Sequence, residues 1–149
     1  MLAACGGTTP VKEASTPVEH PTKIEWAGPT NLPDGVTVLL SAQAWEGFRA
    51  GLPSTARTGF AVDWSKEVVL VIAGREDSEL GKRVRVSRLA RPADQVELDL
   101  VFEGPGADVS MPNHPTAFAT APAAPFAGQP AVRLTWQGQP WDAPVKYLP

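Results

Sequence analysis

Apolar and polar residues alternate most clearly between positions 81 and 103, on both sides of the segment Arg91-Pro92-Ala93-Asp94-Gln95. A period of two is typical of strands with one buried face, and a proline-containing turn between two such strands predicts a β-hairpin. A turn centred near Ala93 places the charged residues of the two strands on one face, where opposite charges meet. These residues are Arg83, Arg85, Asp99 and Glu103, and the apolar residues on the other face are Val84, Val86, Val96, Leu98, Leu100 and Phe102.

Two apolar segments predict the centre of the fold. Residues 36–40 follow the turn Pro33-Asp34-Gly35 and are mostly β-branched or aliphatic, so we expect a strand there. Residues 67–74 form a nearly continuous apolar run of strand length, which is typical of a strand covered on both faces. We therefore expect 67–74 to be the central strand of the core.

One short helix is predicted over residues 42–52, where large apolar side chains recur at helical spacing after Ser41 at the N-cap position. Residues 131–136 alternate again and predict a last core strand, and 141–148 predict an edge strand or a docked tail. The 16 prolines and 13 glycines argue against a helical bundle. We expect an all-β fold, a mainly antiparallel sandwich or a barrel-like sheet, with one short helix and a long Pro-rich loop.

The predicted loop is the segment 104–130, which has six prolines, three glycines and a single charged residue. Proline cannot donate to a strand ladder, so we expect only short extended pieces there, such as 116–120. Loops of this length in a small domain are usually functional or disordered, and the large apolar residues of this segment argue against disorder. One interpretation makes Met111, Phe118 and Phe126 the anchors of a partner-binding surface, because interfaces favour methionine and aromatic residues. The other interpretation places the two phenylalanines in the β-core.

The N-terminal residues Leu2-Ala3-Ala4-Cys5 resemble the lipobox of bacterial lipoproteins, in which a cysteine after small residues receives diacylglycerol. We expect residues 1–5 to be the remainder of a lipoprotein signal, with Cys5 as the lipidation site. Residues 6–30 are expected to form a flexible tether, and 31–149 a single domain. A glycine follows the cysteine where aspartate is associated with inner-membrane retention. The expected location is therefore the bacterial outer membrane or cell surface, with the membrane contacted through the anchor.

Composition argues against several classes of function. The formal net charge is −3, opposite in sign to what a groove that tracks phosphates needs, so no nucleic-acid partner is expected. Two histidines and one cysteine are too few for an imidazole-rich or thiolate-rich metal site, and no cofactor is expected. The only histidine of the expected domain, His114, shares the Pro-rich segment with Ser110. We expect it to make local hydrogen bonds rather than to activate a nucleophile.

A run of ten residues carries a resemblance to a known family: Val62-Asp63-Trp64-Ser65-Lys66-Glu67-Val68-Val69-Leu70-Val71. It is preceded by a short helix and followed by a turn at Gly81, two alternating strands and a Pro-rich segment. In that segment Pro125-Phe126 or Ala117-Phe118 stands where Pro-Tyr is usual. The stretch from Trp45 to Thr135 thereby resembles the PrcB C-terminal domain family, small β-rich modules of bacterial envelope proteins. The resemblance implies a non-catalytic accessory or assembly subunit that contacts another envelope protein, commonly with lipid anchoring.

Three classes of function remain. The leading hypothesis is a lipid-anchored, non-catalytic accessory subunit of an outer-envelope complex, of surface-protease or surface-layer type, that binds its partner through segment 104–130. The first alternative is a protease inhibitor that presents a rigid Pro-rich loop. The second alternative is a cell-wall glycan-binding module that uses tryptophans as stacking platforms. The candidate platforms are Trp26, Trp64, Trp136 and Trp141.

Overall fold

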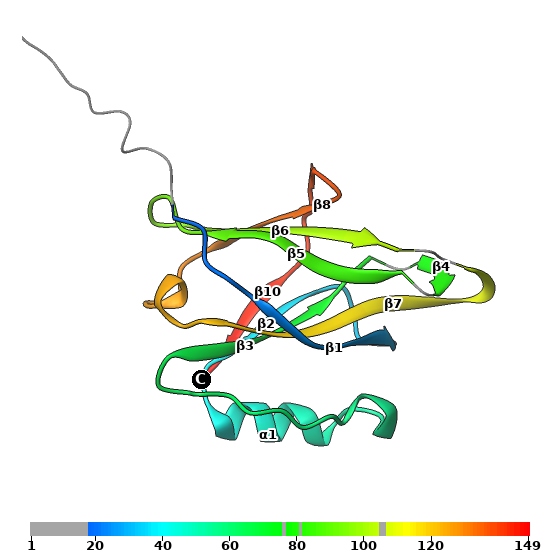
Figure 1. The fold of residues 1–149 in the computed structure, drawn as a ribbon, viewed down its shortest axis with the longest axis horizontal. Helices are drawn as coiled ribbons and strands as arrows, with labels where there is room; N and C mark the ends of the chain where they lie inside the picture. The colour runs from blue at the N-terminus through cyan, green and yellow to red at the C-terminus, as the bar shows by residue number, and fades with distance from the viewer. Residues whose placement is uncertain (1–17, 76, 81, 105–106) are drawn as a thin grey trace, which may run out of the picture.

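The computed structural model describes residues 18–75, 77–80, 82–104 and 107–149 (Figure 1). Its strands are β1 (Lys23–Thr30), β2 (Gly35–Leu39), β3 (Glu67–Ala73), β4 (Asp77–Leu80), β5 (Arg83–Ala90), β6 (Val96–Glu103), β7 (Ala107–Pro122), β8 (Val132–Trp136), β9 (Gln139–Pro140) and β10 (Val145–Leu148). The described part of the chain also contains the α-helix α1 (Ala42–Ala50) and the short 3₁₀ helices η3 (Ser54–Ala56) and η4 (Ala124–Phe126).

The strands form two sheets. The first sheet has the order β1-β7-β3-β2-β10, with β4 paired to β7, and the second sheet has the order β5-β6-β8-β9. Neighbouring strands are antiparallel except for β10 with β2 and β8 with β6, which are parallel. Figure 1 shows the first sheet between the second sheet and α1. The predicted all-β sandwich with one short helix is therefore confirmed, and the described strands do not close into a barrel.

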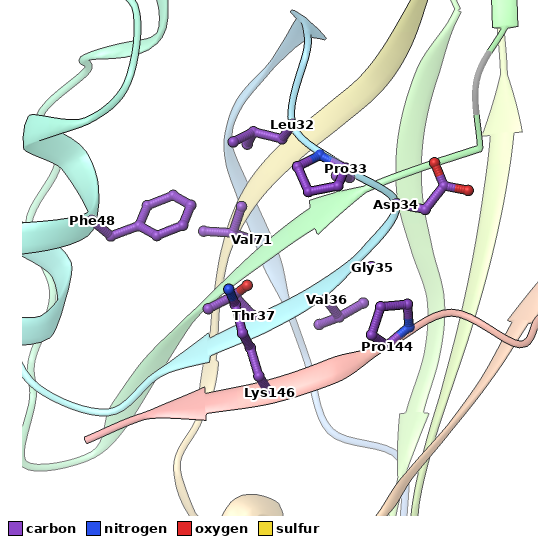
Figure 2. A pocket seen from close by; sticks show the side chains of 11 residues that line it. Leu32, Pro33, Asp34, Gly35, Val36, Thr37, Phe48, Val71, Pro144 and Lys146 are labelled. Atoms are coloured by element: carbon purple, nitrogen blue, oxygen red, sulfur yellow. The ribbon is translucent and has the colours of Figure 1, made fainter.

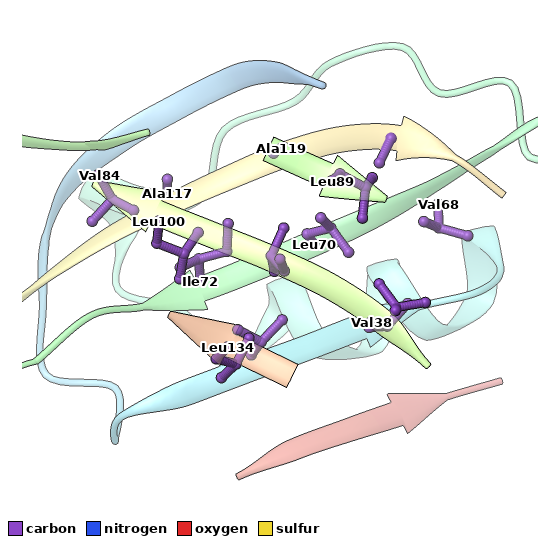
Figure 3. Packing of buried hydrophobic residues seen from close by; sticks show 14 of the residues in the cluster. Val38, Val68, Leu70, Ile72, Val84, Leu89, Leu100, Ala117, Ala119 and Leu134 are labelled. Atoms are coloured by element: carbon purple, nitrogen blue, oxygen red, sulfur yellow. The ribbon is translucent and has the colours of Figure 1, made fainter. Parts of the chain in front are cut away.

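The main hydrophobic core fills the space between the two sheets (Figure 3). From the first sheet, the alternate residues Val68, Leu70 and Ile72 of β3 point into it. From the second sheet, Leu98 and Leu100 of β6 meet them, and all five side chains are almost completely buried. Burial of an aliphatic side chain of this size contributes roughly 1.5–3 kcal/mol. This layer therefore holds the two sheets together.

A second apolar cluster lies on the opposite face of the first sheet, beneath α1. Val69 and Val71 of β3 point to this side, where they share the cluster with Trp45 of the helix. The helix begins after Ser41, whose hydroxyl accepts a hydrogen bond from Ala44 N at 3.1 Å, as expected of an N-cap. Strand β3 is thus covered on both faces, which explains its continuous apolar sequence.

The predicted hairpin between residues 81 and 103 is confirmed. Strands β5 and β6 pair with Arg83 opposite Glu103, which is the expected register. A bulge at Ser87 then shifts the pairing by one residue, so that Leu89 lies opposite Leu98. Because one residue of shift exchanges the two faces of a strand, the bulge turns Leu89 into the core.

The segment 104–130 is not a long loop, and this expectation was wrong. Residues 107–122 form β7, which pairs with β1 on one side and with β3 on the other. Alanine and proline are poor strand formers, but position between two partner strands overrides that local preference. Three alanines of β7 face the main core, where small side chains leave room for the larger residues of the second sheet. They are Ala117, Ala119 and Ala121.

The ladder tolerates Pro115 because of its neighbour His114. Pro115 O accepts a hydrogen bond from Gly74 N at 2.7 Å, but proline has no N–H to return to Gly74 O. The imidazole Nδ1 of His114 lies 3.0 Å from Gly74 O and donates the missing bond. A side chain thus replaces the absent backbone donor. The hydrogen bond of His114 is therefore not the local one that was predicted, because Gly74 lies 40 positions away in the sequence.

The fold begins earlier in the chain than the sequence predicted. Residues 23–30, assigned to the tether 6–30, form β1 and pair with β7 along the edge of the first sheet. Before them, His20 N donates to Leu89 O at 2.8 Å, so this part of the predicted tether also contacts the domain. The apolar pattern of β1 was obscured by Gly-Pro at positions 28 and 29. Residues 6–17 of the predicted tether lie outside the described residues.

Candidate functional site

A small, largely apolar pocket opens on the outer face of the first sheet, next to α1 (Figure 2). Its volume is about 190 Å³. It is lined by Leu32, Pro33, Asp34, Gly35, Val36, Thr37, Phe48, Val71, Ala73, Pro144 and Lys146. Four segments that are far apart in the sequence therefore build one site.

Strand register determines the floor of the pocket. Thr37 of β2 lies opposite Val71 of β3 on one side and opposite Lys146 of β10 on the other. Residues directly opposite each other point to the same face of a sheet, and Val71 belongs to the cluster beneath α1. The three side chains therefore form a row on the helix side. Thr37 is buried at the bottom of the row, and Lys146 is exposed at the edge of the sheet.

The walls of the pocket come from the helix and from the turn before β2. Phe48 of α1 stacks on Trp45, with the ring centroids 6.4 Å apart. On the other side Gly35 has a φ of 142°, and a Cβ at this position would lie 2.5 Å from Pro144 O. The close approach is held by Val36 N, which donates to Pro144 O at 3.0 Å. Only glycine at position 35 allows the chain before β10 to form this wall.

Two charged side chains line the pocket, and they differ in their partners. Asp34 Oδ1 lies 2.8 Å from Nδ1 of His114, the nitrogen that also reaches Gly74 O. A carbonyl oxygen only accepts, so Nδ1 carries a hydrogen that it donates to Gly74 O, and Asp34 Oδ1 lies beside the same N–H group. Lys146 has no hydrogen-bond or ion-pair partner among the residues that the structure describes. The carboxylate is already held, whereas the ammonium group is available to a ligand.

The size and the lining of the pocket suit a single apolar side chain. A cavity of about 150 Å³ holds a benzene-sized group, whereas sites for drug-sized ligands commonly measure about 300–1,000 Å³. A leucine or phenylalanine side chain inserted here would be desolvated against Phe48 and Val71. Burial of its surface would contribute about 25 cal/mol per Å² of apolar area. The site can therefore anchor a protruding apolar group of another molecule.

Two of the three predicted partner-binding residues lie in the core. Phe118 is 0% exposed and packs against Trp26 and Trp45, with centroid distances of 4.8 and 5.5 Å. Phe126 is 2% exposed and belongs to the main core. A ring without exposed surface cannot contact a partner, so the partner-binding prediction is wrong for both. The alternative interpretation, in which they line the β-core, is confirmed.

The other predicted site residues lie outside the described side chains. These are Met111, the third partner-binding candidate, and Cys5, the lipidation candidate. Their roles stay predictions. Sequence reasoning in turn missed Thr37 and Lys146 of the pocket. The sequence predicted the turn at Pro33-Asp34-Gly35 and the elements around it, but no sequence signal indicated that they form a pocket.

Most tryptophans serve packing. Four of the five pack against other aromatic side chains of the domain: Trp26, Trp45, Trp136 and Trp141. Trp64 differs, because it also borders an open groove between the start of β3 and η4. Lys66, Glu67 and Gln129 supply polar groups to the same groove. Among the predicted stacking platforms, Trp64 is therefore the one that lies in a groove with polar side chains in the described part of the chain.

Within the described ranges, no group of three or more His, Cys, Asp and Glu residues is arranged to hold a metal ion. The described helices include none that is long and apolar enough to cross a membrane. Comparison of the chain with protein-family models, with curated proteins and with solved structures shows no match.

Proposed function

We propose that this chain is a non-catalytic, lipid-anchored accessory subunit of a bacterial outer-envelope complex, of the surface-protease or surface-layer type, that acts by contact with another envelope protein. The observation that carries the contact is the apolar pocket of about 190 Å³ on the outer face of the first sheet. The lipobox-like Leu2-Ala3-Ala4-Cys5 supports the location. The resemblance to the PrcB C-terminal domain family supports the class of function.

The pocket has the composition of an interface anchor site. Protein interfaces concentrate their binding energy where an apolar or aromatic side chain fills a desolvated pocket that is surrounded by polar groups. Here Leu32 and Phe48, which are partly exposed, supply apolar surface, and Asp34 and Lys146 supply the polar rim. The proposed contact surface is therefore this pocket, in place of the buried phenylalanines of segment 104–130.

Crosslinking from the pocket in living cells tests the contact. Benzoylphenylalanine in place of the exposed Pro144, at the pocket rim, is expected to crosslink one envelope protein that mass spectrometry identifies. The same group in place of the exposed Arg133, on the outer face of the second sheet, is the matched control and is expected to give no such product. The further change Thr37→Leu, which fills the pocket floor, is expected to abolish the product. Equal products from both positions, or none from position 144, would contradict the proposal.

The lipid anchor has its own test. Intact-mass analysis of the native protein is expected to show acyl chains on Cys5, because stable anchoring needs more than one chain and diacylglycerol with an N-acyl group supplies this. An unmodified thiol at Cys5 in the native protein would contradict the envelope location. Partner contact and location are thus tested independently.

The groove beside Trp64 favours a second candidate function, cell-wall glycan binding. A partly exposed indole beside polar side chains is an arrangement that can stack on a sugar ring and hydrogen-bond its hydroxyls. Trp64→Ala is then expected to abolish binding to purified peptidoglycan, while the control Trp141→Ala retains it. Equal retention by both variants would reject this candidate. The protease-inhibitor alternative assumed a long Pro-rich loop, and residues 107–122 of that segment form a strand instead.

A further inference from the structure

The pocket combines an apolar interior with a cation that has no partner within the described part of the chain, and this combination indicates the chemistry of its ligand. Its apolar lining includes the partly exposed side chains of Leu32 and Phe48, with the buried Val71 beneath them. Figure 2 shows the Lys146 side chain extending from β10 across β2 toward Thr37, in agreement with the strand register. Among the described residues Lys146 has no partner. A complementary ligand therefore carries an anionic group next to an apolar group.

We propose that the pocket binds the C-terminal residue of the partner protein, with an apolar side chain in the cavity and the α-carboxylate at the Lys146 ammonium group. This inference rests on the proposed function, because it names the part of the partner that makes the contact. In a C-terminal residue the α-carboxylate and the side chain are attached to the same carbon. A single residue therefore supplies both groups within the small dimensions of the site.

The volume of the pocket favours a side chain over a lipid. The cavity of about 190 Å³ is little larger than the roughly 150 Å³ that holds a benzene-sized group. A leucine, isoleucine or phenylalanine side chain matches this space. The long acyl chain of a membrane lipid requires a much larger cavity. The volume therefore favours the side chain of a terminal residue over a lipid tail as the occupant.

The position of Asp34 sets the direction in which the ligand lies. Lys146 lies opposite Thr37. Thr37 is three residues beyond Asp34, and three residues of extended chain span about 10 Å. A carboxylate is attracted to the Lys146 end and repelled from the Asp34 end. In the proposed complex Asp34 Oδ2, the oxygen that is not paired with His114, accepts from a backbone N–H group that precedes the terminal residue. The partner chain thus leads away from the pocket past Asp34.

Peptide binding to the full chain tests this inference. The probes are fluorescein-labelled Gly-Thr-Ser-Thr-Leu with a free C-terminal carboxylate, the same peptide as its C-terminal amide, and the acid form ending in serine. Fluorescence anisotropy is expected to show that the leucine acid binds about threefold to fivefold more tightly than the amide, as an exposed ion pair allows. The serine acid is expected to bind at least about tenfold more weakly, because it leaves the cavity unfilled.

Variants of two exposed lysines assign the carboxylate contact. Lys146→Met is expected to remove the preference for the acid while leaving the affinity of the amide unchanged. Lys66→Met, at the groove beside Trp64, is the matched control and is expected to leave both affinities unchanged. Added salt is expected to reduce the preference for the acid, because it screens the ion pair. Equal binding of acid and amide by the wild-type chain would overturn the proposal, as would an equal loss for both peptides in Lys146→Met.

The crosslinking experiment separates this inference from the proposed function. If position 144 crosslinks an envelope protein but none of the leucine peptides binds, the inference fails and the proposed function stands. If position 144 gives no crosslink and no leucine peptide binds, both the inference and the proposed function fail. Octanoate is included as a competitor. If octanoate displaces the labelled leucine acid at a lower concentration than the unlabelled peptide does, the assignment to a protein terminus is overturned.

Discussion

The outer faces of the two sheets are opposite in character. On the first sheet, Trp26 and Phe118 stack on each other and Trp45 of α1 packs against Phe118, so this face carries a second apolar cluster. The outer face of the second sheet instead carries charged side chains that are partly or fully exposed. They are Arg85, Arg88, Glu97, Asp99, Glu103 and Arg133. The first sheet is thus buried on both faces over much of its area, and the second on one.

The charges on the second sheet are paired with one another. Arg85 Nε lies 2.9 Å from Glu103 Oε2, and Arg88 Nη1 lies 2.8 Å from Glu97 Oε1. The hydrogen bond from Arg85 lowers the pKa of the Glu103 carboxyl and raises the pKa of Arg85 itself. Water and salt screen exposed pairs of this kind, so they add little to the free energy of unfolding. Stability therefore depends on the two apolar layers.

This difference explains two kinds of sequence pattern. Strands β5 and β6 alternate because each has one buried and one solvated face. Strand β3 has a continuous apolar sequence because both of its faces are buried. The pocket lies where α1 no longer covers the first sheet, so it exposes part of a face that is apolar elsewhere. The contrast between the faces can be tested by substitution.

The largest expected effect is at the covered face. Phe118→Ala is expected to lower the free energy of unfolding by about 3–5 kcal/mol, because it removes a completely buried ring. Urea denaturation measures the change. Val101→Ala, at a half-buried position on the outer face of the second sheet, is the control and is expected to change it by about 0.5 kcal/mol or less. A nearly unchanged midpoint for Phe118→Ala together with lost partner capture would restore Phe118 as a contact residue.

The two faces of the β5–β6 hairpin provide the next test. Leu100→Ala is expected to cost about 2–5 kcal/mol, because Leu100 is buried between the sheets. Arg83→Ala is expected to cost less than about 1 kcal/mol, although Arg83 Nη1 donates to Ala27 O at 2.7 Å, because the side chain is exposed. Denaturation midpoints in the reverse order would mean that the register is shifted by one residue.

A half-buried polar contact should have an intermediate effect. The Tyr147 hydroxyl donates to Pro130 O at 2.7 Å, so Tyr147→Phe is expected to cost about 1 kcal/mol. Burial raises the pKa of Tyr147 above its ordinary value of 10.0. The stability that the neutral hydroxyl contributes to the folded state is therefore fully present below pH 10.0, and it is lost as the pH rises through the folded-state pKa.

Absorbance can follow this group directly, because the chain has a single tyrosine. Ultraviolet titration of the folded protein is expected to show phenolate formation above the ordinary value. The variant Tyr147→Phe is expected to lack the corresponding loss of stability at alkaline pH. A titration midpoint at or below 10.0 would contradict the burial of this side chain.

The smallest expected effect is at the charged face. The pKa of Glu103 is lowered from 4.5 in the folded protein. The stability that the ionised carboxylate contributes is therefore present above pH 4.5, and it is lost as the pH falls through the folded-state pKa. Glu103→Gln is therefore expected to shift the thermal midpoint slightly at neutral pH and low salt. The shift is expected to vanish in acid and in high salt. A large, salt-independent loss would show that the ion pairs of the second sheet are major determinants of stability.

Local sequence patterns were sufficient where burial follows a regular period. The hairpin, the central strand β3 and the helix after Ser41 were all predicted, since alternation, apolar runs and N-caps act over a few neighbouring residues. Strand β7 was missed because its conformation depends on partners that are distant in the sequence. Pro115 continues the strand only because the His114 side chain reaches Gly74 O.

The sequence by itself determined the all-β class, the single helix and the faces of the hairpin, because side-chain periodicity specifies which surfaces are buried. It also supplied the lipobox-like cysteine on which the proposed location rests. Only the tertiary structure decided that Phe118 and Phe126 are core residues, since their burial requires the strands and the helix around them. The pocket likewise exists only after folding. Lys146 reaches Thr37 because β10 docks parallel to β2, a contact between residues more than a hundred positions apart that no local pattern encodes.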